Sequence, residues 1–149
     1  MFEVEYGGFW IRFAALFIDA IFICLVFIAP AIIIYGQDYL TSDILIHGFW
    51  DVMLSYVLPF VVTIWFWLKF LGTPGKLLLD LQIVDAGTLQ KMTLKQAVGR
   101  YFAYIPAMLP LLIGLIWVAF DKRKQGWHDK LAGTVVVRGR SLAMLNRQD

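Results

Sequence analysis

Three long apolar stretches dominate the pattern of hydrophobic and polar positions. Between residues 13 and 32 the only charged side chain is Asp19, and residues 52–68 and 101–120 carry none. Each stretch approaches the roughly 20 residues that a helix needs to cross about 30 Å of hydrocarbon. The pattern predicts an all-α membrane protein with two firm transmembrane helices, at about residues 9–34 and 52–71, and a third apolar segment at 100–120.

The third segment, "YFAYIPAMLPLLIGLIWVAF", contains Pro106 and Pro110. Proline removes a backbone hydrogen bond and bends or breaks a helix. Two halves of about ten residues are too short to cross a bilayer, so surrounding protein must shield their freed backbone groups. We therefore expect a broken or re-entrant third segment that returns the chain to the side from which it came.

The segments between the apolar stretches predict a small β-rich cap. Apolar and polar residues alternate around residues 79–84, and "DAGT" follows as a turn, so residues 77–92 are expected to form a β-hairpin. Thr93 and Gln96 have the spacing of a capping box that begins a helix. The apolar run "TVVVR" at 134–138 is a candidate third strand, because an isolated hairpin is marginally stable.

The distribution of charge predicts the topology. The loop at 36–51 contains aspartates and no Lys or Arg, whereas basic residues gather in the loop at 69–100 and in the tail at 121–149. By the positive-inside rule, the first loop lies outside, and the N-terminus, the cap and the tail are cytoplasmic. The net charge is only +2, and the uneven distribution of basic residues is accounted for by topology. We therefore expect no nucleic-acid partner.

Composition agrees with a bilayer as the main partner. The chain of 149 residues is 60% hydrophobic and has a mean hydropathy of +0.73. This is well above the apolar share of soluble domains. We expect one membrane domain over residues 1–149.

Two charges interrupt the first apolar stretch, "FWIRFAALFIDAIFICLVF". Arg12 and Asp19 are seven residues apart, which places them on one helix face about 10 Å apart along the axis. Each costs about 2.5–3.5 kcal/mol in hydrocarbon. Arg12 can extend to the cytoplasmic interface, but Asp19 must be neutral, paired or in contact with water. By depth, Arg100 is its closest candidate partner and Lys69 a weaker one.

These charges allow three interpretations. They fix how the helices pack, or Asp19 binds a cation or proton on a transport path. In the third, Arg12 and the basic cytoplasmic residues bind an anionic lipid headgroup.

The motifs "GFWIRFAALFID", "GTPGKLLLDLQIVDAGTLQKMTLKQAVGR" and "FDKRKQGWHDKLAGTVVVR" together resemble the RDD family of membrane proteins, over about residues 8–138. The family is named for one arginine and two aspartates. The resemblance makes Arg12 the arginine, Asp19 the first aspartate and Asp129 the second, with Asp121 as the alternative. It implies an integral protein of a bacterial inner membrane, and solute transport or cation/proton antiport in some members.

Other chemistry finds little support in the sequence. His47 and His128 fall on opposite sides of the predicted membrane, so we expect each to be a surface or interfacial residue and exclude a metal site shared by the two. "GTPGK" lacks the length and the Ser or Thr of a phosphate-binding loop, and no nucleophile lies beside a base at a recognisable spacing. We expect neither an enzyme nor a cofactor.

The favoured function is transport of a small ion or solute. In that hypothesis Asp19 is the exchangeable site, Arg12 tunes its charge, and Asp129 belongs to a gate or cap supported by Arg100 and Asp121. Because two or three spans enclose little volume, transport implies a homo-oligomer or a partner subunit. The alternative is a scaffold in which the same charges only hold helices and cap together.

Overall fold

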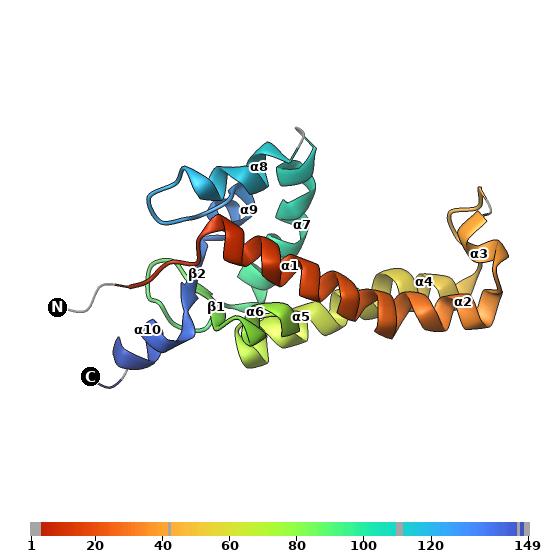
Figure 1. Cartoon of the computed structure of the whole chain (residues 1–149), viewed down its shortest axis with the longest axis horizontal. Helices are drawn as coiled ribbons and strands as arrows, with labels where there is room; N and C mark the ends of the chain where they lie inside the picture. Colours follow the sequence, from red (N-terminus) through yellow and green to blue (C-terminus); the bar gives the residue numbers. More distant parts are fainter. Residues whose placement is uncertain (1–3, 42, 110–111, 146, 148–149) are drawn as a thin grey trace.

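Two long helical arms dominate the computed structural model, which describes residues 4–41, 43–109, 112–145 and 147. They run in opposite directions beside each other (Figure 1). The first arm, Phe9–Tyr35, has 27 residues and the second, Phe49–Leu78, has 30, and both are apolar enough to span a membrane. The first comprises α1 (Phe9–Ile23), η1 (Cys24–Ile28) and α2 (Ala29–Tyr35). After α3 (Asp38–Thr41), the second comprises α4 (Phe49–Val52), η2 (Met53–Val57), α5 (Leu58–Phe70) and α6 (Pro74–Leu78). Helices that are long and apolar enough to span a membrane are thus present at both predicted positions.

A π-helical turn precedes the proline in each arm. The Ala29 N–H donates to the Cys24 carbonyl, and the Leu58 N–H donates to the Met53 carbonyl, five residues back in both cases. Pro30 and Pro59 follow immediately in the first turns of α2 and α5. A proline ring crowds the preceding turn, and the wider turn relieves that crowding. Each helix therefore continues past its proline.

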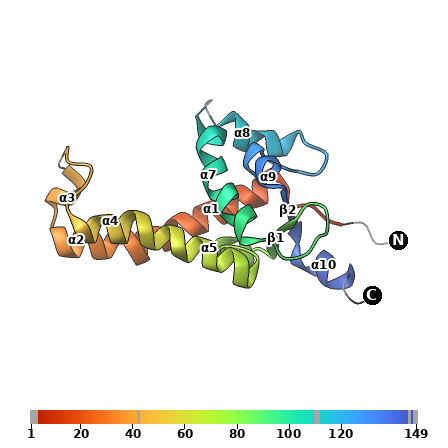
Figure 2. The same cartoon turned by 180° about the vertical axis from the view of Figure 1, so that it is seen from behind.

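The third apolar segment is sharply bent. Helix α7 (Leu94–Met108) begins at the predicted capping box, in which the Thr93 and Gln96 side chains each accept the other's backbone N–H, at 3.2 and 2.9 Å. Helix α8 (Ile113–Ile116) and the 3₁₀ turn η3 (Trp117–Ala119) follow at 115° to α7. Both views show α7 running across the two arms rather than along them (Figures 1 and 2).

The predicted cause of this bend is wrong in part. Pro106 lies inside α7 and the helix continues beyond it to Met108. Proline's own φ is helical, so the helix continues, although the missing N–H removes the donor that would otherwise bond the Phe102 carbonyl. Pro110 lies outside the described residues.

The cap is a two-stranded antiparallel sheet. Strand β1 (Leu81–Asp85) pairs with β2 (Thr134–Arg138), with Leu81 opposite Arg138 and Asp85 opposite Thr134. Tyr6 adds a bridge to Val137. Short helices flank β2: α9 (Trp127–Ala132) before it and α10 (Gly139–Leu145) after it.

The predicted hairpin over residues 77–92 is wrong, although its first strand and its turn exist. The Asp85 carboxylate accepts the N–H groups of Gly87 and Thr88, both at 2.8 Å, and the Gln96 side-chain amide of α7. The turn is thus tied to α7. The place beside β1 goes to β2, which buries three consecutive valines completely.

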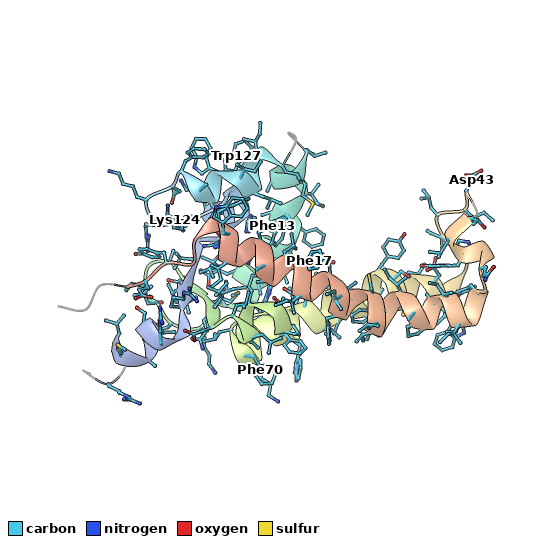
Figure 3. All side chains as sticks on the ribbon, viewed as in Figure 1. Phe13, Phe17, Asp43, Phe70, Lys124 and Trp127 are labelled. Atoms are coloured by element: carbon cyan, nitrogen blue, oxygen red, sulfur yellow. The ribbon has the colours of Figure 1, made fainter. Side chains whose placement is uncertain are left out.

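The core joins the arms to the sheet, whereas the outer surface of the arms is apolar and exposed. One cluster combines side chains from α1, α5, β1, α7 and β2, among them Ala15, Trp67, Ile83, Ala97 and Val136. By contrast Phe17 of α1 is 66% exposed and projects outward together with Phe13 and Phe70 (Figure 3). Exposed apolar surface on this scale marks contact with lipid or with another protein.

Candidate functional site

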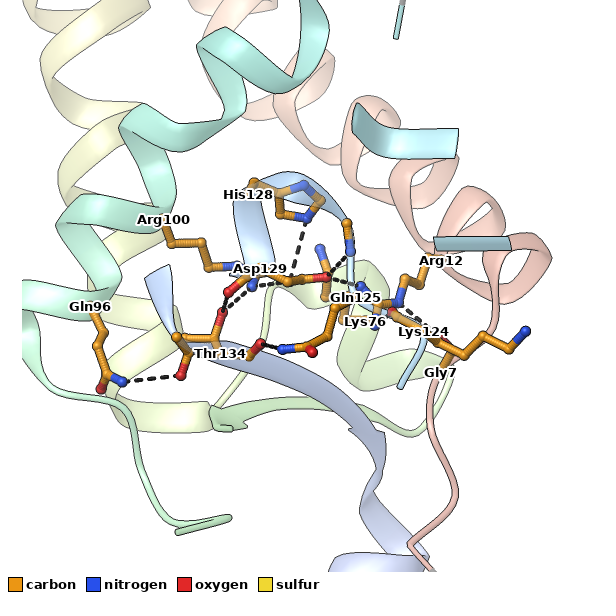
Figure 4. Close-up of polar contacts among 12 residues, drawn as sticks. Gly7, Arg12, Lys76, Gln96, Arg100, Lys124, Gln125, His128, Asp129 and Thr134 are labelled. Atoms are coloured by element: carbon orange, nitrogen blue, oxygen red, sulfur yellow. Dashed lines mark hydrogen bonds and ion pairs between the residues drawn. The ribbon is translucent and has the colours of Figure 1, made fainter. Parts of the chain in front are cut away.

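Asp129 is the centre of a buried cluster of charges (Figure 4). Its side chain is fully buried, and one carboxylate receives two arginines: Arg12 Nη1 at 2.5 Å on Oδ2, and Arg100 Nη1 on Oδ1. The Gly126 N–H also donates to Oδ2, at 2.9 Å. Asp129 lies in the first turn of α9, where a carboxylate pairs with the free backbone N–H groups of the helix start. Asp129 therefore ties both arginines to the start of α9.

Arg12 connects three separate parts of the chain. Besides Asp129, its guanidinium donates from Nε to the Gly7 carbonyl at 2.8 Å and from Nη2 to the Lys124 carbonyl at 2.5 Å. The side chain is only 10% exposed. Acceptors inside the protein hold the guanidinium, so Arg12 does not need water or lipid headgroups as partners, and its depth in the membrane stays a prediction.

Arg100 is fully buried on α7. Its Nη1 also donates to Thr134 Oγ1 at 2.5 Å, and its guanidinium carbon lies 5.5 Å from the Trp67 ring centroid and 5.9 Å from that of Tyr104. Arg100 Nε and Nη2 have no hydrogen-bond acceptor in the described part of the chain. The prediction that Arg100 pairs with Asp19 is wrong: α7 crosses the arms and delivers Arg100 to Asp129 instead.

Asp19 binds the junction between α5 and α6. Its Oδ2 accepts from Thr73 Oγ1 at 2.5 Å, its Oδ1 accepts the Gly75 N–H at 2.7 Å, and Lys76 Nζ lies 3.9 Å away. Asp19 is 8% exposed and borders a small cavity of about 40 Å³ between the arms. Lys69, the weaker predicted partner, instead lies over the Trp65 ring. Lys76 and Thr73 were missed, although "TPG" is a typical helix start.

His128 is buried, contrary to the expected surface position. It is 4% exposed and stacks on the Tyr104 ring at 4.2 Å between centroids, with an interplanar angle of 18°. Its Nε2 lies 3.5 Å from Asp129 Oδ1. The residue before Asp129 thus faces the same cluster from the same short helix.

Burial and charge set the protonation of this pair. Burial, followed by repulsion from Arg100, Arg12 and Lys76, lowers the pKa of His128 to about 3, against the opposing attraction of Asp129. Burial disfavours the charged form of Asp129, but Arg100 and then Arg12 outweigh it and hold the Asp129 pKa well below its usual range. Near neutral pH His128 is neutral and Asp129 is ionised.

Asp121 forms a separate local structure. It pairs with Lys130, whose side chain is 45% exposed, and accepts the N–H groups of Arg123 and Gln125, both at 3.1 Å. The hydrogen bond from Lys130 is the main cause that lowers the Asp121 pKa. No contact joins Asp121 to Arg12 or Arg100 among the described residues, so the geometry groups Asp129 with the arginines.

A second polar cluster lies at the other end of the arms. Asp51 is 1% exposed and accepts the Tyr39 and Ser55 hydroxyls, both at 2.8 Å, and the His47 N–H at 2.9 Å. In the sequence analysis, Asp51 contributes only as one of the acidic residues of the loop at 36–51 that predict the topology. The i, i+4 spacing of Asp51 and Ser55 on one helix was the available signal. In the described part of the chain, no group of three or more His, Cys, Asp or Glu could hold a metal ion.

Comparison with known proteins agrees with the RDD resemblance. The RDD family model matches residues 6–133. The uncharacterized protein RP437 of Rickettsia prowazekii (strain Madrid E) is 36% identical over 102 residues, 68% of this chain and 54% of that protein, so the chain spans about half of that relative. The uncharacterized protein YxaI of Bacillus subtilis (strain 168) is 31% identical over 147 residues, 88% of this chain and 96% of that protein. No solved structure matches the chain. With two helices suited to a membrane, the chain belongs to the RDD family.

Proposed function

We propose that this RDD family protein transports a small ion or solute across a bacterial inner membrane, with Asp19 as the exchangeable site. The observation that carries the proposal is a carboxylate, 8% exposed, beside a cavity of about 40 Å³ in the middle of a membrane arm. A water molecule needs about 10–15 Å³, so water or a small cation fits there. Ionisable groups at this depth are costly and typically mark an ion or proton path.

The contacts of Asp19 suggest how exchange is transmitted. A proton or cation on Asp19 competes with Lys76, at 3.9 Å, and weakens the hold on α6. Helix α6 ends at Leu78 and β1 begins at Leu81, so a shift of α6 reaches the sheet directly. Asp129, Arg12 and Arg100 then form the gate, because they lock α1 and α7 onto the segment before β2.

Topology and assembly complete the proposal. The N-terminus, the sheet and the basic tail are cytoplasmic, as the positive-inside rule favours. Two arms and one bent segment enclose little volume. The transporting unit is therefore a homo-oligomer or includes a partner membrane subunit.

A scaffold is the second candidate, and one observation favours it. Both carboxylates already have partners within the chain: Thr73 and Gly75 for Asp19, and two arginines for Asp129. Such a network stabilises the fold whether or not anything is transported. In that case the charges only hold α1 against α6 and α9.

Asp19→Asn separates the two functions. The purified chain is placed in proteoliposomes containing a pH-sensitive dye, and proton flux is followed after a Na⁺ or K⁺ gradient is imposed. Transport predicts that Asp19→Asn keeps its melting temperature and oligomer size but loses the flux, whereas Asp43→Asn, on the exposed loop, retains it. Normal flux through Asp19→Asn overturns the proposal, and loss of folding together with flux favours the scaffold.

A further inference from the structure

A second and larger cavity, of about 320 Å³, lies among α1, α7, α8 and α9. It differs from the small cavity beside Asp19 in both its place and its lining. One end presents Arg12, Lys76 and Arg100, with neutral His128 beside them. The rest is mainly apolar, from side chains that include Phe13, Leu16, Met108 and Ile116.

The electrostatics of this cavity favour an anion. Three cations line it, whereas their carboxylate partners, Asp19 and Asp129, are not among its lining residues. Three positive charges against two negative ones leave one positive charge in excess. A positive charge in apolar surroundings is costly until an anion accompanies it.

Arg100 supplies hydrogen-bond donors for such an anion. Its side chain is fully buried and lines the cavity, and its Nε and Nη2 have no acceptor with hydrogen-bond geometry in the described part of the chain, although the Tyr104 side chain interacts with the guanidinium. Buried donors are nearly always paired in folded proteins, so each exception needs an explanation. A guanidinium with two such donor nitrogens, Nε and Nη2, suits the oxygens of a phosphate or carboxylate.

The apolar end of the cavity reaches the outer surface of the arms. Phe13 is 53% exposed, Leu16 55% and Ile116 42%, and all three also line the cavity. An acyl chain in the cavity therefore continues outward over the apolar surface of α1 and α8. The volume lies at the lower end of the roughly 300–1,000 Å³ of ligand pockets, which suits one chain.

We propose that this cavity binds an anionic amphiphile from the membrane, with a phosphate or carboxylate head against Arg12, Lys76 and Arg100 and an acyl chain against α1 and α8. The site does not depend on transport through Asp19. It places a lipid at the junction of the arms with the sheet, where α7 is held by Arg100.

The test measures binding to the full chain in a neutral maltoside detergent by titration calorimetry, with empty micelles as the blank. The probes are decyl phosphate, decyl phosphocholine and inorganic phosphate, which separate the charged head from the chain. Lys76→Met removes one cation and leaves the Arg12–Asp129–Arg100 cluster in place, with Lys69→Met on the exposed end of α5 as its control. Met108→Trp fills the apolar end, and its control is Leu109→Trp, at a neighbouring site that is 77% exposed.

We expect decyl phosphate to bind about tenfold more tightly than decyl phosphocholine, as the loss of a charge-assisted hydrogen bond implies. Lys76→Met and Met108→Trp should each weaken it by a similar factor, while both controls bind like the wild type. Equal binding of both amphiphiles, or no binding of decyl phosphate, overturns the proposal. Inorganic phosphate binding as tightly, and unchanged by Met108→Trp, overturns it as well, because the site then takes a free anion. Because Met108→Trp spares every charge, it keeps the test decisive if Lys76→Met fails to fold.

Discussion

Asp129→Asn removes the charge that two arginines share while leaving the shape of the side chain almost unchanged. Arg12 is 10% exposed and Arg100 is fully buried, so neither guanidinium can recover its hydration without opening the structure. Removing one partner of a buried ion pair costs about 3–5 kcal/mol. Because both arginines lose the same counter-ion, we expect a loss of unfolding free energy in the upper half of that range.

Asp121→Asn is the matched control. The same chemical change there breaks a pair with Lys130, whose side chain is 45% exposed, and pairs of that kind contribute about 1 kcal/mol or less. Both variants and the wild type are unfolded in detergent and followed by tryptophan fluorescence. The buried variant should lose several times more stability than the control.

Two results would refute this reasoning. One is equal stability of Asp129→Asn and Asp121→Asn. The other concerns pH: because the pKa of Asp129 is depressed in the folded chain, its contribution is fully present above the unfolded value of about 3.9 and disappears only as the pH falls below it. The difference between wild type and Asp129→Asn should therefore persist from neutral pH to about pH 4. A difference that vanishes at a higher pH contradicts the depressed pKa.

Three further outcomes are expected. Because the pKa of His128 is lowered from 6.5 to about 3, lowering the pH through this range should reduce the free energy of unfolding by roughly 1 kcal/mol per pH unit. His128→Phe, which keeps a ring against Tyr104, should remove this dependence in melting experiments at different pH. Gly75→Ala should lower the melting temperature, because a Cβ would lie 2.2 Å from the Ala15 carbonyl oxygen, whereas Gly99→Ala, in open space on α7, should raise it slightly. A reporter fused at the C-terminus should read cytoplasmic, and an external reading contradicts the proposed topology.

The two arms were predictable because stretches of 17 and 20 residues with at most one charge, at 52–68 and 13–32, leave a chain few alternatives. The first arm, Phe9–Tyr35, has nearly its predicted bounds of 9–34, but the second arm does not. The sequence predicts the second span from residue 52, whereas the helix begins at Phe49, since Tyr39, His47 and Ser55 bury Asp51 within its first turns. A hydropathy scale treats every carboxylate as polar, so it does not show that hydrogen bonds from other parts of the chain allow Asp51 to be buried in the helix.

The cap was predicted from local sequence patterns. These patterns correctly predict a strand and a turn, but they predict the wrong partner for β1. The predicted turn after Asp85 is present, because the Asp85 carboxylate accepts the backbone N–H groups of Gly87 and Thr88. Burial decided the pairing: β2 contains three consecutive valines that are completely buried beside β1, and this gain exceeds what residues 88–92 offer. Local sequence specifies a turn, but the partner strand is chosen across fifty residues.

The partners of Arg12 and Asp19 illustrate the same limit in the site. Their spacing correctly predicts one helix face and no direct contact, but the pattern of α1 contains no information about what faces it. Asp19 holds α6, which leads into β1, and Arg12 holds α9, which leads into β2. Since β1 and β2 pair with each other, two charges on one helix fasten both halves of the same sheet. We therefore expect a ligand or proton that weakens one attachment to loosen the other through the sheet, as the proposed transport cycle or the proposed lipid would require.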